Sequence, residues 1–380
     1  MTSARIVDAD GHIMEPPNLW IDNLESRYKD RAMRLRTDNQ GLEYLEIDGK
    51  QSRVLNGGQL GSLGLLDEEM APRRAEAFEP GLLNFEDCTP PAAVDPHARI
   101  KWMDEQGIDV TVLYPSLGLN WQSECDDASL AAAHCRVYNN WIAAFCEAYP
   151  RRLIPAASIS LMDVDEGIKE IKRAVKLGIG GVYLFPNPTN GIHYGDAYYD
   201  PFWAEVQDLG LPIGIHVSST PNYIGHHLIR DAGFNNNTWF FSLAQKMDCQ
   251  LCFMQFFQGA VFDRFPTLKV GVVESGCTWI AHRLDSMDAF AKGDTSTSMK
   301  LRPSEYFERQ CWITGEADER AFSAMARVIG AERLHWGSDY PHEEGHAEPV
   351  KMIGQCLGDL STEDRRLIFG ENACALYNLN

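Results

Sequence analysis

Residues 7–20, VDADGHIMEPPNLW, place two aspartates, a histidine and a glutamate directly after the short apolar run ARIV of residues 4–7. A surface turn explains the aspartates and the glycine. It does not explain His12 and Glu15, which precede two prolines and the apolar pair Leu19 and Trp20. We therefore interpret the segment as a first strand that carries ligand-type side chains at its end.

Seven further apolar runs follow, each bounded by glycine, proline or aspartate, and all eight are predicted to be buried strands. They cover residues 5–9, 110–115, 153–159, 181–186, 213–217, 269–274, 311–315 and 334–339. Segments with apolar residues at helical spacing lie between most of them. Strands that alternate with helices predict a parallel sheet, and eight such units favour a closed (β/α)₈ TIM barrel over an open sheet. We expect one domain over residues 1–380.

The first crossover, residues 17–95, is too long for a simple loop. It contains a predicted hairpin, EYLEIDGKQSRVL at residues 43–55, that turns at Asp48-Gly49. A glycine-rich piece, NGGQLGSLGLL, follows at residues 56–66. We expect this insertion to form a lid beside the mouth of the barrel.

Composition and charge exclude several classes of function. The net charge is −20 and no basic run is present, so neither nucleic acid nor an anionic membrane surface is an expected partner. No apolar run approaches the roughly 20 residues that span a bilayer, and residues 1–10 do not resemble a secretory signal. The ten cysteines are scattered, and we interpret the one close pair, Cys249 and Cys252, as part of a buried helix. We expect a cytoplasmic homo-oligomer that acts on a small molecule.

Ligand-type residues recur at the ends of the predicted strands. Asp10 and His12 follow the first strand, His216 ends the fifth, Glu274 ends the sixth and Asp339 ends the eighth. In a TIM barrel these strand ends surround one axis. Carboxylates gathered there without a cation would repel one another, so the pattern predicts a divalent metal. Mixed imidazole and carboxylate ligands suit zinc, iron or manganese, and no organic cofactor is predicted.

Motifs spread over nearly the whole chain resemble a known family. They include DADGHIMEPPNLW, GIHVSS, FPTLKVGVVESGCTWIAHRLD and HWGSDYPHEEG. The chain resembles the amidohydrolase-related family (amidohydrolase 2) of the metal-dependent amidohydrolase superfamily, which includes aminocarboxymuconate-semialdehyde and γ-resorcylate decarboxylases. The resemblance implies hydrolysis or non-oxidative decarboxylation at a metal held by Asp10, His12, His216 and Asp339.

Two features depart from the family pattern. The superfamily's first motif is commonly His-x-His, whereas this chain has Asp10-Gly11-His12. The decarboxylases carry a histidine at the end of the sixth strand, whereas this chain has Glu274. The predicted fourth strand offers no lysine to bridge two metals. We therefore expect one ion, with Glu274, Asp339 and His342 as the catalytic groups.

Two alternatives to the single-ion enzyme remain open from the sequence. Glu15 and Glu274 could hold a second ion, as in dinuclear iron or iron–manganese monooxygenases of the isobutylamine N-hydroxylase type, which share the acidic pattern. A non-catalytic subunit of a barrel assembly is the third reading, and the intact ligand set argues against it. His226 and His227 are candidates for contact with substrate or a second metal, or are exposed loop residues.

Overall fold

The computed structural model describes residues 5–55, 59–73, 75–222, 238–293 and 299–379. Eight parallel strands form one sheet in the order β1-β5-β6-β7-β8-β9-β10-β11. The strands are β1 (Val7–His12), β5 (Val110–Tyr114), β6 (Leu153–Ser158), β7 (Gly181–Leu184), β8 (Pro212–His216), β9 (Lys269–Val273), β10 (Cys311–Gly315) and β11 (Leu334–Trp336). All eight predicted strands are present, within a few residues of their expected ends.

Backbone hydrogen bonds bring the last strand round to the first. The N–H groups of Ser338 and Asp339, just beyond β11, donate to Asp10 O over 3.1 and 2.8 Å, and His12 N–H donates to Tyr340 O over 2.8 Å. Gly337 lies where the two segments meet, and a Cβ there would come within 2.2 Å of Asp10 Cβ. The fold is therefore the predicted (β/α)₈ TIM barrel.

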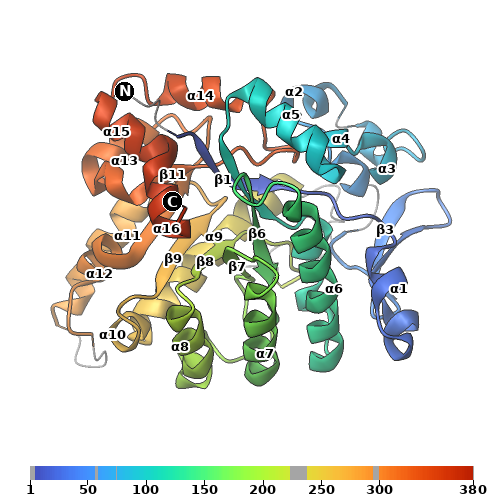
Figure 1. Cartoon of the computed structure of the whole chain (residues 1–380), viewed down its shortest axis with the longest axis horizontal. Helices are drawn as coiled ribbons and strands as arrows, with labels where there is room; N and C mark the ends of the chain where they lie inside the picture. Colours follow the sequence, from blue (N-terminus) through green and yellow to red (C-terminus); the bar gives the residue numbers. More distant parts are fainter. Residues whose placement is uncertain (1–4, 56–58, 74, 223–237, 294–298, 380) are drawn as a thin grey trace.

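Helices surround the sheet, and Figure 1 shows α6, α7 and α8 side by side along one flank. Most connect consecutive strands, as parallel pairing requires. The helices after the insertion are α5 (Pro96–Gln106), α6 (Ala128–Glu147), α7 (Val164–Val175), α8 (Asp200–Asp208), α9 (Thr238–Gln258), α10 (Val261–Arg264), α11 (Trp279–Ala291), α12 (Pro303–Gln310), α13 (Phe322–Ile329), α14 (Pro349–Cys356), α15 (Thr362–Arg366) and α16 (Asn372–Tyr377). Cys249 and Cys252 are fully buried on α9, which fits the buried-helix interpretation. Within the described ranges no helix is both long and apolar enough to cross a membrane.

Three apolar clusters are present among the described residues, and the two larger ones build the core of the barrel. The larger one fills the space around the sheet and extends into the insertion. The smaller one combines residues of several strands with the C-terminal helix α16, whose Tyr377 hydroxyl lies 2.7 Å from that of Tyr114.

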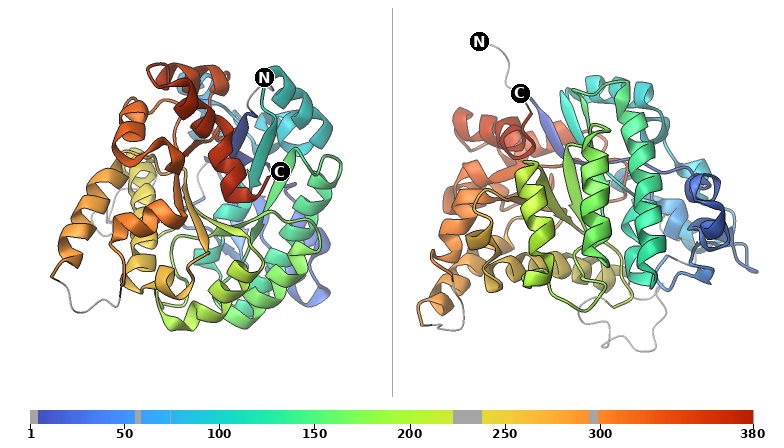
Figure 2. Two further views of the ribbon diagram at one scale, coloured as in Figure 1. Left: turned by 60° about the vertical axis from the view of Figure 1, so that its left-hand side comes forward. Right: turned by 60° about the horizontal axis from the view of Figure 1, so that its bottom comes forward.

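The insertion lies at one side of the barrel (Figures 1 and 2). Its antiparallel sheet consists of β2 (Arg34–Thr37), β3 (Glu43–Ile47) and β4 (Lys50–Gln51), and its helices are α1 (Leu19–Asn23), α2 (Asp67–Met70), α3 (Phe85–Cys88) and α4 (Pro91–Val94). The predicted hairpin turn is present, with φ of 50° at Asp48 and 72° at Gly49. Arg31 ties this hairpin to the barrel, because its guanidinium donates to Asp48 over 2.9 Å and to Asp127, the N-cap of α6, over 2.7 Å.

Candidate metal centre

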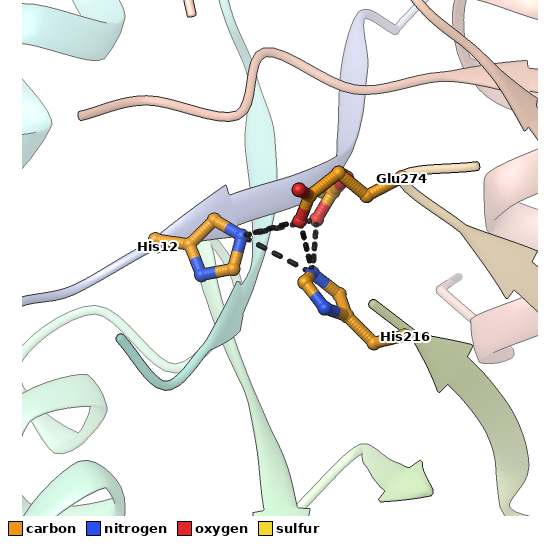
Figure 3. Close-up of side chains that lie close together, drawn as sticks. His12, His216 and Glu274 are labelled. Atoms are coloured by element: carbon orange, nitrogen blue, oxygen red, sulfur yellow. Dashed lines mark hydrogen bonds and ion pairs between the residues drawn. The ribbon is translucent and has the colours of Figure 1, made fainter. Parts of the chain in front are cut away.

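Five predicted ligand residues converge at the carboxyl ends of the strands. Asp10 and His12 come from β1, His216 from β8, Glu274 from just beyond β9 and Asp339 from just beyond β11. Figure 3 shows His12, His216 and Glu274 pointing toward one another. The strand pairing of β1 is irregular between residues 8 and 11, and such bulges redirect side chains next to active sites.

The donor atoms of these side chains lie within a few ångströms of one another. His216 Nε2 lies 3.2 Å from Asp10 Oδ1, from Glu274 Oε2 and from His12 Nε2. His12 Nε2 lies 3.3 Å from Asp339 Oδ1 and 3.4 Å from Asp10 Oδ1, with Glu274 Oε2 at 3.9 Å. Donors that share one ion through bonds of about 2.0–2.2 Å stand at such separations.

The other ring nitrogen of each histidine is held by a backbone carbonyl. His12 Nδ1 lies 2.7 Å from Pro115 O, and His216 Nδ1 lies 2.7 Å from Val217 O. A carbonyl accepts only, so each Nδ1 carries the proton and, in the neutral ring, each Nε2 presents a lone pair to the centre. Histidines that bind metals are oriented in this way.

Two of the carboxylates belong to residues with a strained backbone conformation. Glu274 has φ of 53° and Asp339 has φ of 51°, a left-handed conformation that costs a non-glycine residue about 1–3 kcal/mol. Such strain persists where the surrounding structure holds it, often at functional sites. Asp339 is nine-tenths buried, yet its Oδ2 has no hydrogen-bond partner among the described residues.

Burial and charge set the protonation of the centre. Burial opposes charge on His216, but Asp10 and Glu274 outweigh it and raise its pKa to about 9. Burial raises the pKa of Glu274 to about 8 and that of Asp339 well above its usual value. For Asp10 the two histidines outweigh burial and lower the pKa. The metal-free centre therefore retains a proton on His216 that a bound cation would replace.

The donor set fits a divalent ion. It supplies two inward-facing imidazole nitrogens, several carboxylate oxygens and one buried carboxylate oxygen that lacks a partner. This chemistry suits zinc, iron or manganese, which accept both nitrogen and oxygen ligands.

The same residues carry the family relationship. A model of the family described as Amidohydrolase matches residues 7–379. The chain belongs to this amidohydrolase family. Among its relatives, the γ-resorcylate decarboxylase of Polaromonas sp. strain JS666 is 26% identical over 298 residues, which cover 74% of this chain and 87% of that protein.

Solved structures show the same fold. An amidohydrolase from Mycobacterium avium subsp. paratuberculosis K-10 matches this amidohydrolase with a TM-score of 0.81 and 23% identity, over 99% of this chain and all of the other. A dihydroxybenzoic acid decarboxylase from Polaromonas sp. JS666, solved with manganese and the inhibitor 2-nitroresorcinol, matches with a TM-score of 0.65 and 19% identity, over 100% of this chain and 98% of that one.

His342 of the amidohydrolase lies beside the donor group, as predicted. Its Nδ1 is 3.0 Å from Asp339 Oδ1, and its Nε2 is 2.7 Å from Ser116 Oγ. Burial lowers its pKa well below the usual value, so the ring is neutral. Ser116, His342 and Asp339 are thus joined in one series of polar contacts.

Glu15 does not join the donor group. Its buried carboxylate accepts the N–H groups of Leu117 at 2.9 Å and Gly118 at 3.0 Å, with Ser116 N–H at 3.3 Å. The structure therefore gives no support to Glu15 as a ligand of a second ion, the role that the dinuclear alternative gives it. The reason is the loop after β5, which presents backbone donors to the carboxylate. His226 and His227 lie outside the described residues.

Three residues that the sequence reasoning missed support the centre. Asp8, fully buried on β1, accepts Ser338 N–H and Oγ–H, each over 2.8 Å, and so ties β1 to the segment after β11. Arg99, also buried, donates to the carbonyl of His12 and over 2.8 Å to that of Ala92. Lys246 of α9 reaches Glu316 and Glu344, at 2.8 Å each. Asp8 stands within residues 7–20, and that position is the one feature of the sequence that could have identified it as a supporting residue.

A cavity of about 880 Å³ opens beside the donor group. Asp10, Glu274, Asp339 and His342 line it, together with Lys246. The insertion also contributes to the wall, through Leu55, Ser62, Leu63, Asp67, Met70 and Ala77. A cavity of this size accommodates a small organic molecule.

Proposed function

We propose that this amidohydrolase catalyses the non-oxidative decarboxylation of a small organic acid at a single divalent metal. The observation that carries the proposal is the convergence of two inward-facing imidazoles with Asp10, Glu274 and Asp339 beside a cavity of ligand size. The decarboxylases among the relatives support this reaction over others of the superfamily.

Asp10, His12, His216 and Asp339 would hold the ion. A bound divalent cation withdraws electron density from substrate oxygens, which stabilises charge that develops during bond cleavage. The protein's own contribution is orientation: the carbonyls of Pro115 and Val217 hold the two imidazoles with Nε2 inward. These contacts position the donors before any substrate arrives.

Glu274 is the proposed proton donor. Loss of CO₂ breaks a carbon–carbon bond and leaves the electron pair on the remaining carbon, which then needs one proton. The Glu274 carboxyl lines the cavity, and burial raises its pKa to about 8, so it holds a proton near neutral pH. Asp339 and His342 form the second proton-holding pair, and Ser116 links them to the loop after β5.

The insertion is the proposed lid and the determinant of substrate shape. Leu55, Leu63 and Met70 contribute apolar surface to the lining of the cavity. An apolar wall with a few polar groups at one end suits a planar or unsaturated acid, whose acidic end faces the metal.

The test is a metal-reconstituted assay. The protein, loaded in turn with zinc, manganese or iron(II), is incubated with hydroxybenzoates and short unsaturated carboxylic acids, and CO₂ release is measured. In D₂O the product should carry one deuterium at the carbon that lost CO₂. Glu363→Gln, on the exposed surface, is the control for Glu274→Gln.

The outcomes separate the reactions. CO₂ release that Glu274→Gln abolishes and Glu363→Gln retains supports the proposal. Substrate consumed with uptake of water and no CO₂ identifies a hydrolase and overturns decarboxylation. A requirement for O₂ overturns it as well.

A further inference from the structure

One lysine stands in a cavity wall whose other charged groups are acidic. Lys246 of α9 is the one lysine or arginine among the described residues that line the cavity. Outside the metal centre, the carboxylate side chains in the same lining are Asp67, Glu316, Asp318, Glu343 and Glu344. A cavity lined mainly by one sign of charge selects its ligands by charge.

Two of these carboxylates hold the lysine. Lys246 Nζ lies 2.8 Å from Glu316 Oε1, just beyond β10, and 2.8 Å from Glu344 Oε2, in the segment after β11. Burial opposes the charge of Lys246, but Glu344 and Glu316 outweigh it and raise its pKa, so the side chain stays an ammonium ion. The two carboxylates more than neutralise this one positive charge.

The ammonium group keeps one N–H donor for a ligand. It has three such donors, and Glu316 and Glu344 accept two of them. In the part of the chain that the structure describes, no third acceptor lies within hydrogen-bond distance. The Lys246 side chain is 18% exposed and lines the cavity, so the remaining donor is available to a molecule bound there.

Lys246 stands apart from the metal centre but within reach of its field. It forms no ion pair with Glu274 or Asp339, both of which the structure describes. Its charge nevertheless opposes the rise of the pKa of each of these carboxyl groups. A molecule whose acidic group lies at the metal therefore presents a different part of itself to Lys246.

We infer that Lys246 is a specificity-determining residue: its third N–H binds a neutral oxygen of the substrate, while Glu316 and Glu344 exclude a second carboxylate. The substrate class is then a monocarboxylic acid that also carries a hydroxyl, ether or carbonyl oxygen. Such an oxygen accepts the hydrogen bond without the repulsion that a second carboxylate meets from the acidic lining. The inference rests on the proposed function, which places the one carboxylate at the metal.

The test measures the binding of aromatic acids to the zinc-loaded protein by isothermal titration calorimetry. Benzoate is the reference, meta- and para-hydroxybenzoate add a neutral oxygen, and isophthalate and terephthalate add a carboxylate at the same positions. At least one hydroxybenzoate should bind about tenfold more tightly than benzoate, as expected for one hydrogen bond from a charged donor. Both dicarboxylates should bind more weakly than benzoate.

Variants of the ion-pair group assign these preferences to its members. Lys246→Met should lose the preference for hydroxybenzoate over benzoate, and Lys246→Arg, which keeps a charged donor, should retain it. Glu344→Gln should strengthen dicarboxylate binding roughly fivefold, because the charge of a half-exposed carboxylate is partly screened. Lys351→Met and Glu348→Gln, in an exposed ion pair of α14, are the matched controls and should change neither preference.

Several results would overturn the inference. Dicarboxylates that bind more tightly than benzoate would show that Lys246 takes a second anion. A hydroxybenzoate preference that Lys246→Met retains, dicarboxylate binding that Glu344→Gln leaves unchanged, or no binding of any probe would also refute it. If Lys246→Met fails to fold, the Glu344→Gln comparison decides. The measurement needs no turnover, so the inference can fail while CO₂ release still supports the proposed function.

Discussion

The orientation of two imidazole rings decides what the centre can bind. His12 and His216 each donate a hydrogen bond from Nδ1 to a backbone carbonyl. In the neutral rings both Nε2 atoms are then acceptors, and they lie 3.2 Å apart. Two acceptors at this distance repel unless a proton or a metal lies between them. Asp10 Oδ1 lies close to both Nε2 atoms, so it can contact the same proton or metal.

Replacement of His216 by alanine should remove the metal and leave the barrel folded. The side chain is a donor at the end of β8, and alanine keeps the backbone pairing of this position with Val273. We expect metal per chain, measured by elemental analysis, to fall to near zero with an unchanged circular dichroism spectrum. His97→Ala, at an exposed histidine of α5, should retain full metal. Full occupancy in His216→Ala would refute the ligand assignment.

Glu274→Gln keeps the shape of the side chain and removes its acidic proton. In the single-ion reaction, metal content should stay the same and kcat should fall about 10²- to 10⁴-fold, the usual contribution of a general acid. The limb of the pH–rate profile that reports this group should flatten. A fall of about one ion per chain would instead show that Glu274 binds metal, and an unchanged rate would show that it has no role in the reaction.

At the scale of elements, carboxylates hold the loops that follow two of the strands. Glu15 accepts the N–H groups of residues 116–118 after β5. Glu319 does the same for the loop after β9, where it accepts Cys277 N–H at 2.9 Å and Thr278 N–H at 2.8 Å. These loops carry Ser116 and follow Glu274, so the two carboxylates hold the backbone beside groups of the proposed reaction.

Glu15→Gln should loosen the loop after β5. Each Glu15 oxygen accepts a backbone N–H, and in either orientation the glutamine amide turns an N–H₂ group toward one of these donors. Leaving such a buried donor unsatisfied costs about 1–3 kcal/mol. Urea unfolding should show this loss, with metal content unchanged. Glu105→Gln, exposed on α5, should leave stability unchanged, and an equal loss in both variants would contradict the assignment.

At the scale of the whole molecule, the barrel brings together ionisable side chains from segments that are far apart in the chain. Asp10 and His216 lie 206 residues apart in sequence and 3.2 Å apart in space. Without a cation, the centre keeps protons on His216 and Glu274. The stability of the protein therefore depends on pH and on bound metal through the charge of this centre.

The metal-free protein should lose stability as pH rises from about 6.5 to 9. For His216, the pKa rises from 6.5 to about 9 in the folded state, so its stabilisation is present below 6.5 and is lost as pH passes 9. For Glu274, the folded pKa of about 8 exceeds the usual 4.5, so its contribution falls as pH rises from 4.5 to 8. Thermal melts with a chelator should show a falling Tm over this range.

Bound metal should weaken this trend, because the cation takes the place of the His216 proton. With zinc or manganese added, Tm should fall less between pH 6.5 and 9 than it does with the chelator, and metal affinity should rise with pH. A Tm of the chelated protein that is constant or rising over this range would contradict the description of the centre.

The strand order and most of the ligand set could be predicted from the sequence. Short apolar runs with helical segments between them specify a parallel sheet, and parallel strands bring all their carboxyl ends to one side. Asp10, His12, His216, Glu274 and Asp339 each stand at such an end, so their meeting follows from local position alone.

Contacts between side chains of different loops were decided only by the tertiary structure. Glu15 stands three residues after His12, yet backbone donors about a hundred residues further along bind its carboxylate. Lys246 enters the cavity wall from a helix whose apolar sequence indicated only burial. Local sequence specifies which way a strand end points, because alternation is a backbone property. It does not specify which distant loop will meet a side chain there, because that depends on how the whole barrel closes.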